Sequence, residues 1–423
     1  MTRAALRCAA VCALATFALC LEYAAAAAQG GSGGINRPEH LAKPYVILIS
    51  IDGLKPDYLD RFDLPNLRRV ITRGARARAM IPVFPSLTFP NHYSLVTGLR
   101  PARHGIVANS FYDPQRKQKY SLNDENTVAD GSWYGGEPIW VTAETQGMVA
   151  ACFFWPGSEA AIRGVHPSLF KKYVHTTPNG ERVGAVLGWL RLAAERRPHL
   201  ITLYFSAIDS ASHQGPLAAP AVAKAAQELD IVIGQLLNGL EALPFRENIN
   251  LLITSDHGMV DTTPARVIAM ESLIDMSGVI ESYGGPVASL HLRDPARAIQ
   301  TRDQINARLT HGRAYLRHEI PERFYYRDNP RAGDVVVIMD ESWILERAPK
   351  RARAESWGQH GWDNMLPSMR ATFVAMGPGI RPGVTVDEIE NIDVYPLMTE
   401  LLGLRPGAGI DGRPGRILSL ISR

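Results

Sequence analysis

The chain has 423 residues, of which 46% are hydrophobic and 21% charged, and 45 Lys and Arg against 42 Asp and Glu give a net charge of +3 at pH 7. This composition is that of a soluble globular protein, and so small a charge gives no argument for binding a nucleic-acid polymer or an acidic membrane. The length exceeds what one hydrophobic core usually supports, so we predict a large α/β domain with an insertion.

Residues 1–28 have the features of a cleavable signal peptide. Arg3 and Arg7 give a positive start, an apolar centre runs from Ala9 to Leu21, and small residues follow. We therefore expect a periplasmic or secreted protein. An uncleaved anchor is the alternative, but the apolar centre is short. No later apolar run is long enough to span a bilayer, so the mature chain is expected to have no membrane span.

The cysteines agree with this interpretation. Three of the four, Cys8, Cys12 and Cys20, lie in the signal segment. A lipid anchor at Cys20 is disfavoured because the residue before it is a leucine. The mature chain then keeps only Cys152, so it has no intramolecular disulfide, and we expect Cys152 to be a buried core residue.

Three apolar runs predict buried strands of a mainly parallel sheet: Tyr45 to Ser50, Leu200 to Phe205 and Ile249 to Thr254. Each run is followed by an aspartate. In open α/β sheets ligands bind beyond the carboxyl ends of the strands, which is where these aspartates would lie.

The remaining elements are expected as follows in chain order. They are a flexible glycine-rich lead-in (29–43), a helix (65–74), a surface loop (99–140), a helix (216–243), a small α+β insertion (259–356) with strands at 288–292 and 335–339 and a helix at 296–309, and a last strand (371–376). The main domain would then comprise 44–258 and 357–423.

Six residues form a candidate metal-binding set: Asp52, Asp209, His213, Asp256, His257 and His360. Carboxylate and imidazole ligands without thiolates suit Zn²⁺ and also tolerate Mn²⁺ or Fe²⁺. Six ligands suit two three-ligand sites that each keep an open position. Two metals about 3.5–4 Å apart are the usual arrangement for in-line phosphoryl displacement.

The segment from Thr88 to Tyr93 places a hydroxyl, an aromatic ring, an amide and an imidazole within six residues. Taken alone, Thr88 is typical of a helix cap. Beside a divalent metal its hydroxyl would lose its proton readily and become a nucleophile. Asn91 could then donate to the phosphoryl oxygen that gains charge. We expect His92 to support the site, and surface or packing roles for the other histidines: His40, His104, His166, His175, His199, His291, His311 and His318.

Five motifs carry a family resemblance: IDGLKPDY at 51–58, LTFPNHY at 87–93, IDSASHQGP at 208–216, SDHGM at 255–259 and HGWDN at 360–364. In this order, over about residues 44–379, they resemble the nucleotide pyrophosphatase/phosphodiesterase family of the alkaline phosphatase superfamily. The resemblance implies an alkaline-phosphatase-like fold, with a mostly parallel central sheet flanked by helices and a small α+β insertion. Without the extra modules of animal members, the chain looks like a compact bacterial form.

The resemblance also implies roles for individual residues. One zinc ion would be held by Asp209, His213 and His360, and a second by Asp52, Thr88, Asp256 and His257. Thr88 would form a phospho-threonine intermediate that water hydrolyses, and Asn91 would bind a non-bridging phosphoryl oxygen. Phe89 and Tyr204 would sandwich a nucleobase, and Leu122 would line the same pocket.

The leading hypothesis is a two-zinc hydrolase that acts on a small-molecule nucleotide or other phosphodiester and releases a nucleoside 5′-monophosphate. A phosphomonoesterase would need extra positive charge, for example from Lys55 or Arg103. A lipid-derived glycerophosphodiester is a further alternative, because aromatic rings also contact a choline cation. A sulfatase is disfavoured because threonine stands at the nucleophile. A zinc-holding binding protein without catalysis is the alternative from another class. The sequence does not predict the base, the leaving group or the oligomeric state.

Overall fold

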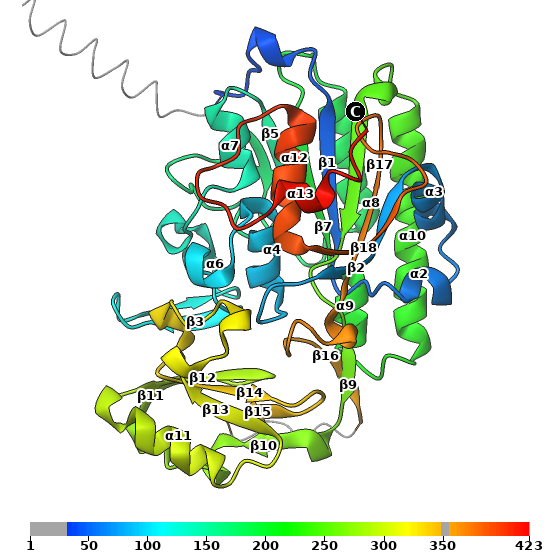
Figure 1. Ribbon diagram of the computed structural model, residues 1–423. Helices are drawn as coiled ribbons and strands as arrows, with labels where there is room; N and C mark the ends of the chain where they lie inside the picture. Colours follow the sequence, from blue (N-terminus) through cyan, green and yellow to red (C-terminus); the bar gives the residue numbers. More distant parts are fainter. Residues whose placement is uncertain (1–31, 348–354, 423) are drawn as a thin grey trace, which may run out of the picture.

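The computed structural model describes residues 32–347 and 355–422, and the expected signal peptide lies outside this range. Within the described residues an eight-stranded sheet has the order β18-β2-β17-β8-β1-β7-β5-β6 (Figure 1). Its strands are β1 (Tyr45–Ile51), β2 (Ala75–Ile81), β5 (Ala150–Phe153), β6 (Leu169–Lys171), β7 (Leu200–Phe205), β8 (Ile249–Thr254), β17 (Ala371–Met376) and β18 (Thr385–Glu390).

Most strands of this sheet are parallel. β1 pairs in parallel with both β7 and β8, and β5 pairs in parallel with β6 and β7. β17 is antiparallel to both of its neighbours, β8 and β2. The three strands predicted to carry the aspartates are therefore adjacent, in the order β8-β1-β7, and the expected fold class is confirmed.

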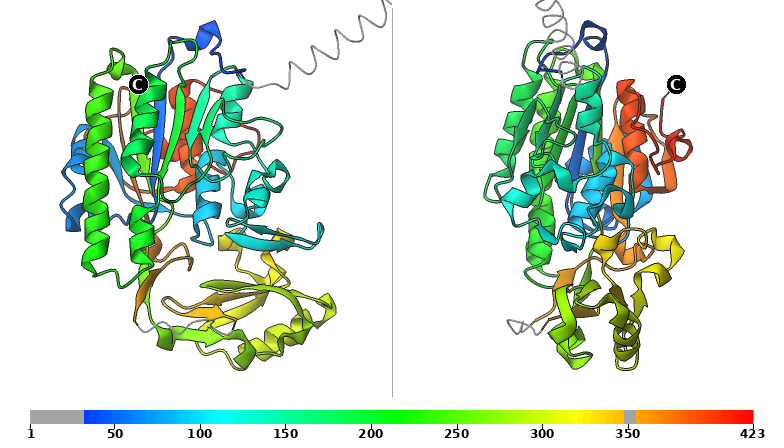
Figure 2. Two further views of the ribbon diagram at one scale, coloured as in Figure 1. Left: turned by 180° about the vertical axis from the view of Figure 1, so that it is seen from behind. Right: turned by 90° about the vertical axis from the view of Figure 1, so that its left-hand side faces the viewer.

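Helices cover both faces of the sheet (Figure 2). Ile47 and Ile49 of β1 point into a core shared with one set of helices, whereas Val46 and Leu48 point into the opposite core, as the two-residue period of a strand requires. The first set is α2 (Tyr58–Arg61), α3 (Pro65–Arg73), α8 (Asn179–Leu190) and α10 (Pro220–Glu241). The second is α4 (Thr88–Thr97), α7 (Ile139–Thr145), α12 (Val394–Leu402) and α13 (Pro414–Ile417).

A smaller sheet lies below the main one in Figure 1. The chain enters this region through β9 (Val260–Thr262) and leaves it through β16 (Trp357–Gln359). These two strands pair with each other. Its antiparallel sheet has the order β11-β12-β14-β13 and packs with α11 (Ala298–Asn306). The strands are β11 (Val279–Tyr283), β12 (Val287–Leu292), β13 (Gly312–Leu316) and β14 (Val335–Met339), with the pair β10 (Val267–Ala269) and β15 (Ile344–Glu346) beside them. The exact limits of the insertion stay a prediction.

Two sequence predictions need correction. The expected loop at 99–140 holds the hairpin of β3 (Ser110–Asp113) and β4 (Gln118–Ser121), together with α5 (Pro101–His104) and α6 (Glu125–Ala129). Phe111 and Tyr120 stack in this hairpin and are buried, so a small aromatic core compensates for its polar composition.

The second correction concerns the lead-in, whose described part is held against the main domain. Ser32 donates to the buried carboxylate of Glu144, and Asn36 donates to the carbonyl oxygens of Ala194 and Arg197. Despite its glycines, the lead-in is therefore held by hydrogen bonds at Ser32 and Asn36 and is not the flexible segment that its composition predicted. No helix among the described residues is long and apolar enough to cross a membrane.

The two-sided packing of β1 leads to a stability prediction. Replacing Ile47, which is fully buried, by alanine should lower the free energy of unfolding by about 2–5 kcal/mol, because it leaves a cavity in the core. Ile231 on α10 is 60% exposed, so Ile231→Ala should change it by less than ~0.5 kcal/mol. Urea denaturation of both variants measures the difference, and equal losses would contradict this packing.

Candidate active site

Three aspartates lie at one edge of the main sheet. Asp52 directly follows β1, Asp256 follows β8 after one residue, and Asp209 lies in α9 (Ala207–Ser212), which begins just after β7. Since these strands are parallel neighbours, their carboxyl ends meet at the same edge. The placement that the apolar runs predicted is therefore confirmed.

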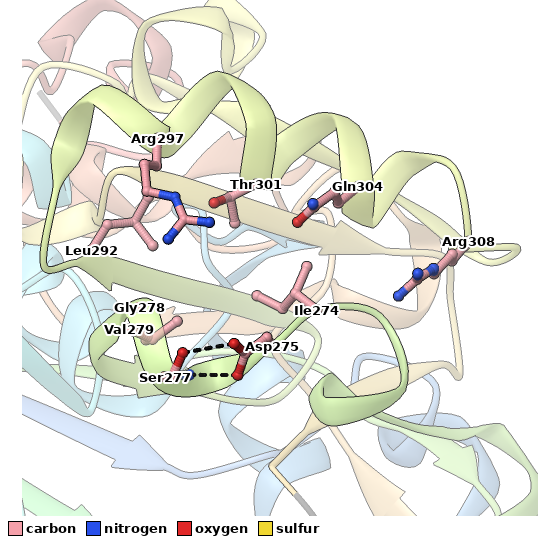
Figure 3. Close-up of a pocket in the computed structure, with 10 residues that line it drawn as sticks. All are labelled: Ile274, Asp275, Ser277, Gly278, Val279, Leu292, Arg297, Thr301, Gln304 and Arg308. Atoms are coloured by element: carbon pink, nitrogen blue, oxygen red, sulfur yellow. Dashed lines mark hydrogen bonds between the residues drawn. The ribbon is translucent and has the colours of Figure 1, made fainter.

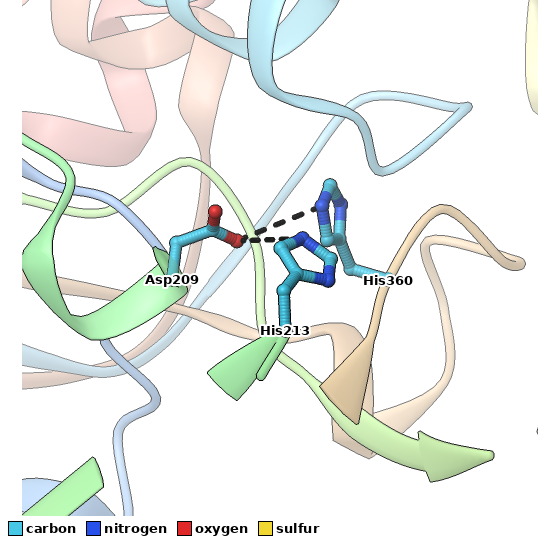
Figure 4. A group of neighbouring side chains, drawn as sticks. All are labelled: Asp209, His213 and His360. Carbon is cyan, nitrogen blue, oxygen red and sulfur yellow. Dashed lines mark ion pairs between the residues drawn. The ribbon is translucent and has the colours of Figure 1, made fainter. Parts of the chain in front are cut away.

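The first group of candidate ligands is Asp209, His213 and His360 (Figure 4). The Nε2 atoms of His213 and His360 lie 3.3 Å and 3.7 Å from Oδ1 of Asp209. Asp209 and His213 are one turn apart, as their spacing predicted. His360 arrives from the loop after β16, so segments far apart in the chain build this group.

The second group is Asp52, Asp256 and His257, all buried. Nε2 of His257 is 2.9 Å from Oδ2 of Asp256 and 3.4 Å from Oδ1 of Asp52. The rings of His257 and His360 stack with their centroids 3.5 Å apart, so the two groups adjoin. All six predicted ligands are thus brought together as two sets of three.

The three histidines share one orientation. Nδ1 of each lies 2.9 Å from a backbone carbonyl oxygen, that of Gly358 for His213, Gly258 for His257 and Ser86 for His360. A carbonyl oxygen can only accept, so Nδ1 carries the proton. In a neutral imidazole this leaves the lone pair on Nε2, the atom turned toward the aspartates, as in histidines that bind metals.

The carboxylates show the complementary feature. One oxygen of each aspartate, Oδ1 of Asp52, Oδ1 of Asp209 and Oδ2 of Asp256, is buried without a hydrogen bond from another described group. No lysine or arginine of the described residues forms an ion pair with them. Burial raises the pKa of Asp52 well above its ordinary value, and the charges of Asp256 and Asp209 raise it further. Such repulsion is what a divalent cation would offset, so these residues fit metal ions.

The neighbouring imidazoles respond to the same charges. Burial works against ionisation of Asp256, but His257 and His92 lower the pKa of this carboxyl below its ordinary value. Burial and the adjacent His257 lower the pKa of His360 to about 3, so its ring is neutral. His92 is itself buried, with one nitrogen 2.7 Å from Oγ of Ser50 and the other 2.9 Å from the carbonyl oxygen of Thr88. Nδ1 of His92 lies 3.4 Å from Oδ2 of Asp256, so it adjoins the site, and its supporting role stays a prediction.

Thr88 is the first residue of α4 and does not cap it. The N-cap is Leu87, without a side-chain bond to the helix. Oγ1 of Thr88 instead lies 3.4 Å from Nε2 of His257. The capping interpretation of this threonine is therefore wrong, and its hydroxyl lies beside the second ligand group.

Asn91 does not point into the site, so its predicted contact with the substrate is wrong. It is fully buried, and its Nδ2 donates to the carbonyl oxygens of Pro85 and Leu87. Its Oδ1 accepts from the backbone N–H of Val83 and from Nδ2 of Asn391. Asn91 therefore holds the segment before Thr88 in shape.

Asn109 occupies the position that the sequence interpretation gave to Asn91. It lines the pocket together with Asp52 and Thr88. Its Oδ1 accepts from the backbone N–H of Phe89 at 2.9 Å, and no group among the described residues accepts from its Nδ2. Asn109 lies in the region expected to be a plain loop, so no local signal near Thr88 could have identified it.

A cavity of about 590 Å³ opens beside the ligands. Predicted residues that line it are Asp52, Thr88, Phe89, Leu122, Tyr204, Asp209, His213 and His360. Its other lining residues include Glu125, Phe154, Trp155, Glu159, Lys172, Tyr173 and Val174. Its volume lies within the range of small-molecule sites.

Tyr204 has a different role from the one expected. It is only 7% exposed, and its hydroxyl donates to Oδ2 of Asp52 at 2.6 Å. Its ring packs edge-on against His92. A ring held in this way cannot cover one face of a base, so the predicted sandwich by Tyr204 is wrong. Tyr173, which is 42% exposed, is the aromatic residue that the sequence interpretation missed.

The remaining predictions concern residues away from this centre. Cys152 is buried and unpaired, as expected. The histidines assigned to packing include His199, stacked on Tyr45, and His311, stacked on Trp343. His175 contacts the hydroxyl of Tyr173 and so lies near the cavity. A separate hollow of about 260 Å³ lies under α11 and contains no predicted site residue (Figure 3).

Comparisons with known proteins agree with this geometry. The family model for type I phosphodiesterase / nucleotide pyrophosphatase matches residues 46–363. Human ectonucleotide pyrophosphatase/phosphodiesterase family member 1 is 37% identical over 390 residues, which cover 88% of this chain and 42% of that protein. The venom phosphodiesterase CdcPDE of Crotalus durissus collilineatus is 36% identical over 401 residues, covering 92% and 48%. The chain thus spans less than half the length of these relatives.

Among solved structures, murine ectonucleotide pyrophosphatase/phosphodiesterase 5 superposes with a TM-score of 0.84 at 28% identity. The match covers 90% of this chain and 100% of that one. That structure is of an inactive threonine-to-alanine variant in complex with AMP. The human protein of the same name gives a TM-score of 0.83 at 28% identity.

The bond from Tyr204 to Asp52 leads to a prediction about metal affinity. Tyr204→Phe should weaken zinc binding about tenfold, because partners that orient a metal ligand typically contribute 10–100-fold. Tyr326→Phe is the matched control, since it removes a buried hydroxyl that donates to the carbonyl oxygen of Val107. Competition with a chromophoric chelator measures both affinities. An unchanged affinity in Tyr204→Phe would contradict the role given to this bond.

Proposed function

Since the chain belongs to the type I phosphodiesterase / nucleotide pyrophosphatase family, we propose that it is a metal-dependent hydrolase that cleaves phosphodiester or pyrophosphate bonds of nucleotides and releases nucleoside 5′-monophosphates. One observation carries the proposal. The hydroxyl of Thr88 lies where the two ligand groups adjoin, at the floor of a cavity with aromatic walls.

The ligand groups would hold two zinc ions. Asp209, His213 and His360 would bind one ion, and Asp52, Asp256 and His257, together with Thr88, the other. When bound, the ions favour the deprotonated hydroxyl and neutralise charge on the phosphoryl oxygens. The choice of zinc rests on the mixture of carboxylate and imidazole ligands without a thiolate.

Thr88 would act as the nucleophile. Its Oγ1 forms a bond to phosphorus while the bond from phosphorus to the leaving oxygen breaks, which gives a phospho-threonine. Water then attacks the phosphorus, breaks its bond to Oγ1 and restores the hydroxyl as the monophosphate leaves. A threonine-to-alanine variant of the murine relative is inactive, which supports this role.

Asn109 would stabilise the phosphoryl oxygen that gains charge. Its Oδ1 is fixed by the N–H of Phe89, the residue after the nucleophile, so its Nδ2 is the amide donor that remains for the substrate. The ten-residue helix α4 also begins at Thr88. The positive end of its dipole would therefore lie near the phosphoryl group of the substrate.

The nucleoside would lie in the aromatic part of the cavity. Phe89 and Tyr173 offer exposed ring surface there, and Leu122 adds an apolar contact. Stacking on such rings contributes about 1–3 kcal/mol per base and tolerates any base. The AMP complex of the murine relative supports a nucleotide as the ligand.

The charges favour a diester over a monoester. Lys172 is the one lysine or arginine among the residues that line the cavity. Lys55 and Arg103, the sequence-based candidates for binding a phosphate dianion, form ion pairs with Asp57 and Asp411 instead. The relatives named above are animal proteins, so the bacterial origin, together with export by a signal peptide, stays a prediction.

Replacing Thr88 by alanine should lower kcat on p-nitrophenyl thymidine 5′-monophosphate by at least about 10³-fold, because no other hydroxyl takes the place of Oγ1. Zinc content should remain nearly unchanged, since all six Asp and His ligands are kept. Thr72→Ala, on the exposed face of α3, is the control and should behave as wild type. Turnover retained by Thr88→Ala would refute the nucleophile assignment.

The two asparagines should respond differently. Asn109→Ala should lower kcat about 10²–10³-fold with little change in stability, as expected for loss of one donor to a transition-state oxygen. Asn91→Ala should chiefly destabilise the fold, because it leaves buried backbone groups of the segment before Thr88 unpaired. Thermal unfolding and kinetics of both variants separate the two effects. The reverse pattern would restore the sequence-based assignment.

A further inference from the structure

Arg182 of α8 is buried in an unusual way. Its side chain is 2% exposed, yet no carboxylate of the described residues forms an ion pair with it. Its Nε and Nη2 donate to the carbonyl oxygen of Thr177 at 3.2 Å and 3.0 Å, and its Nη1 donates to that of Tyr204 at 2.9 Å. Burying a cation that is bonded only to neutral groups costs free energy. The guanidinium nevertheless joins two separate segments through planar, directed hydrogen bonds, and this connection requires an explanation.

The two segments are both parts of the cavity wall. Thr177 ends the loop that follows β6, and this loop carries Tyr173 and Val174, which line the cavity. Tyr204 is on β7, and its hydroxyl holds Asp52. The guanidinium of Arg182 therefore ties the exposed aromatic loop to the strand that positions a metal ligand.

Aromatic packing continues the connection. The guanidinium carbon of Arg182 lies 5.0 Å from the ring centre of Phe154, and Phe154 packs edge-on against Tyr173 at 5.3 Å. Phe154 has a φ of 64°, a left-handed conformation that costs energy for a bulky residue. In this conformation Phe154 lines the cavity while its ring contacts the guanidinium of Arg182.

The other end of the loop is held by Glu159. Its Oε1 accepts from the backbone N–H of Tyr173 at 2.8 Å. Tyr173 is therefore fixed by its N–H before the turn, and Thr177 is fixed by Arg182 after it. The loop between them is otherwise exposed, so these two contacts hold its backbone, and the hydroxyl of Tyr173 adds contacts with Nδ1 of His175 at 2.9 Å and Oγ of Ser206 at 3.4 Å.

We propose that Arg182 is a positioning residue for the nucleoside part of the substrate, because it fixes the loop that carries Tyr173 against β7. This inference rests on the proposed function and adds to it the means by which the aromatic wall is held. Arg182 does not touch the substrate. Its effect should therefore appear in the binding of the nucleoside and be absent for a diester that has none.

The test compares two phosphodiesters with the same leaving group, p-nitrophenyl thymidine 5′-monophosphate and methyl p-nitrophenyl phosphate, on the zinc-loaded enzyme. Arg182→Met should raise KM for the nucleoside substrate about tenfold, within the range expected for a lost stacking contact, with kcat changed less than about threefold. The kcat/KM for the methyl ester should stay within about twofold of wild type. Arg182→Lys keeps the charge and one donor, and should give an intermediate KM.

Glu159→Ala keeps the test valid if Arg182→Met does not fold, because it releases the other end of the loop at a half-buried position. It should show the same selective rise in KM. Glu181→Ala, at the exposed neighbouring position on α8, is the matched control and should match wild type. Equal losses on both substrates in the Arg182 and Glu159 variants would overturn the positioning role. A wild-type enzyme with no preference for the nucleoside substrate would overturn the proposed function itself.

Discussion

Three neighbouring carboxylates that pair with no lysine or arginine of the described residues are the constraint on which this structure depends. Asp52, Asp209 and Asp256 face one another at the edge of the sheet, and burial, together with the charges of Asp256 and Asp209, raises the pKa of Asp52. The fold tolerates this arrangement because parallel strands fix the backbone on which the aspartates lie. The surrounding groups orient them: the hydroxyl of Tyr204 on Asp52, the backbone N–H of Gly53 on Asp256, and three imidazoles anchored through Nδ1 to carbonyl oxygens. Such a site is preorganised for cations.

In the proposed mechanism, the chemistry and the recognition of the substrate meet at Thr88. Its hydroxyl borders the charged floor, while the next residue, Phe89, belongs to the apolar wall and orients Asn109 through its N–H. Across the cavity, Arg182 connects the loop of Tyr173 to the strand that holds Asp52 through Tyr204. Arg182 contacts only the backbone carbonyl oxygen of Tyr204, so its loss should affect the loop of Tyr173 and leave the hydroxyl that holds Asp52 in place.

The central strands and the six candidate metal ligands could be predicted from the sequence because their strongest signals are local. Apolar runs that end in an aspartate identified β1, β7 and β8, and the spacing of Asp209 and His213 indicated one helical turn. β2 escaped prediction because alternating arginines hide its buried alanines, which pack only once β17 and β18 lie beside it. Asn91 is near Thr88 in the sequence, whereas only the tertiary fold brings Asn109 to Phe89. The family resemblance assigns Tyr204 to the base, but burial commits its hydroxyl to Asp52.

The most direct test of the central claim is the kcat/KM of the purified chain, from Gln29 onward, on p-nitrophenyl thymidine 5′-monophosphate and on p-nitrophenyl phosphate. Both should be measured with zinc, after chelation and after zinc is restored. A two-metal phosphodiesterase should strongly prefer the diester, lose turnover on chelation and regain it with zinc, at two zinc ions per chain. Diester turnover that survives removal of the metal, or a preference for the monoester, would contradict it.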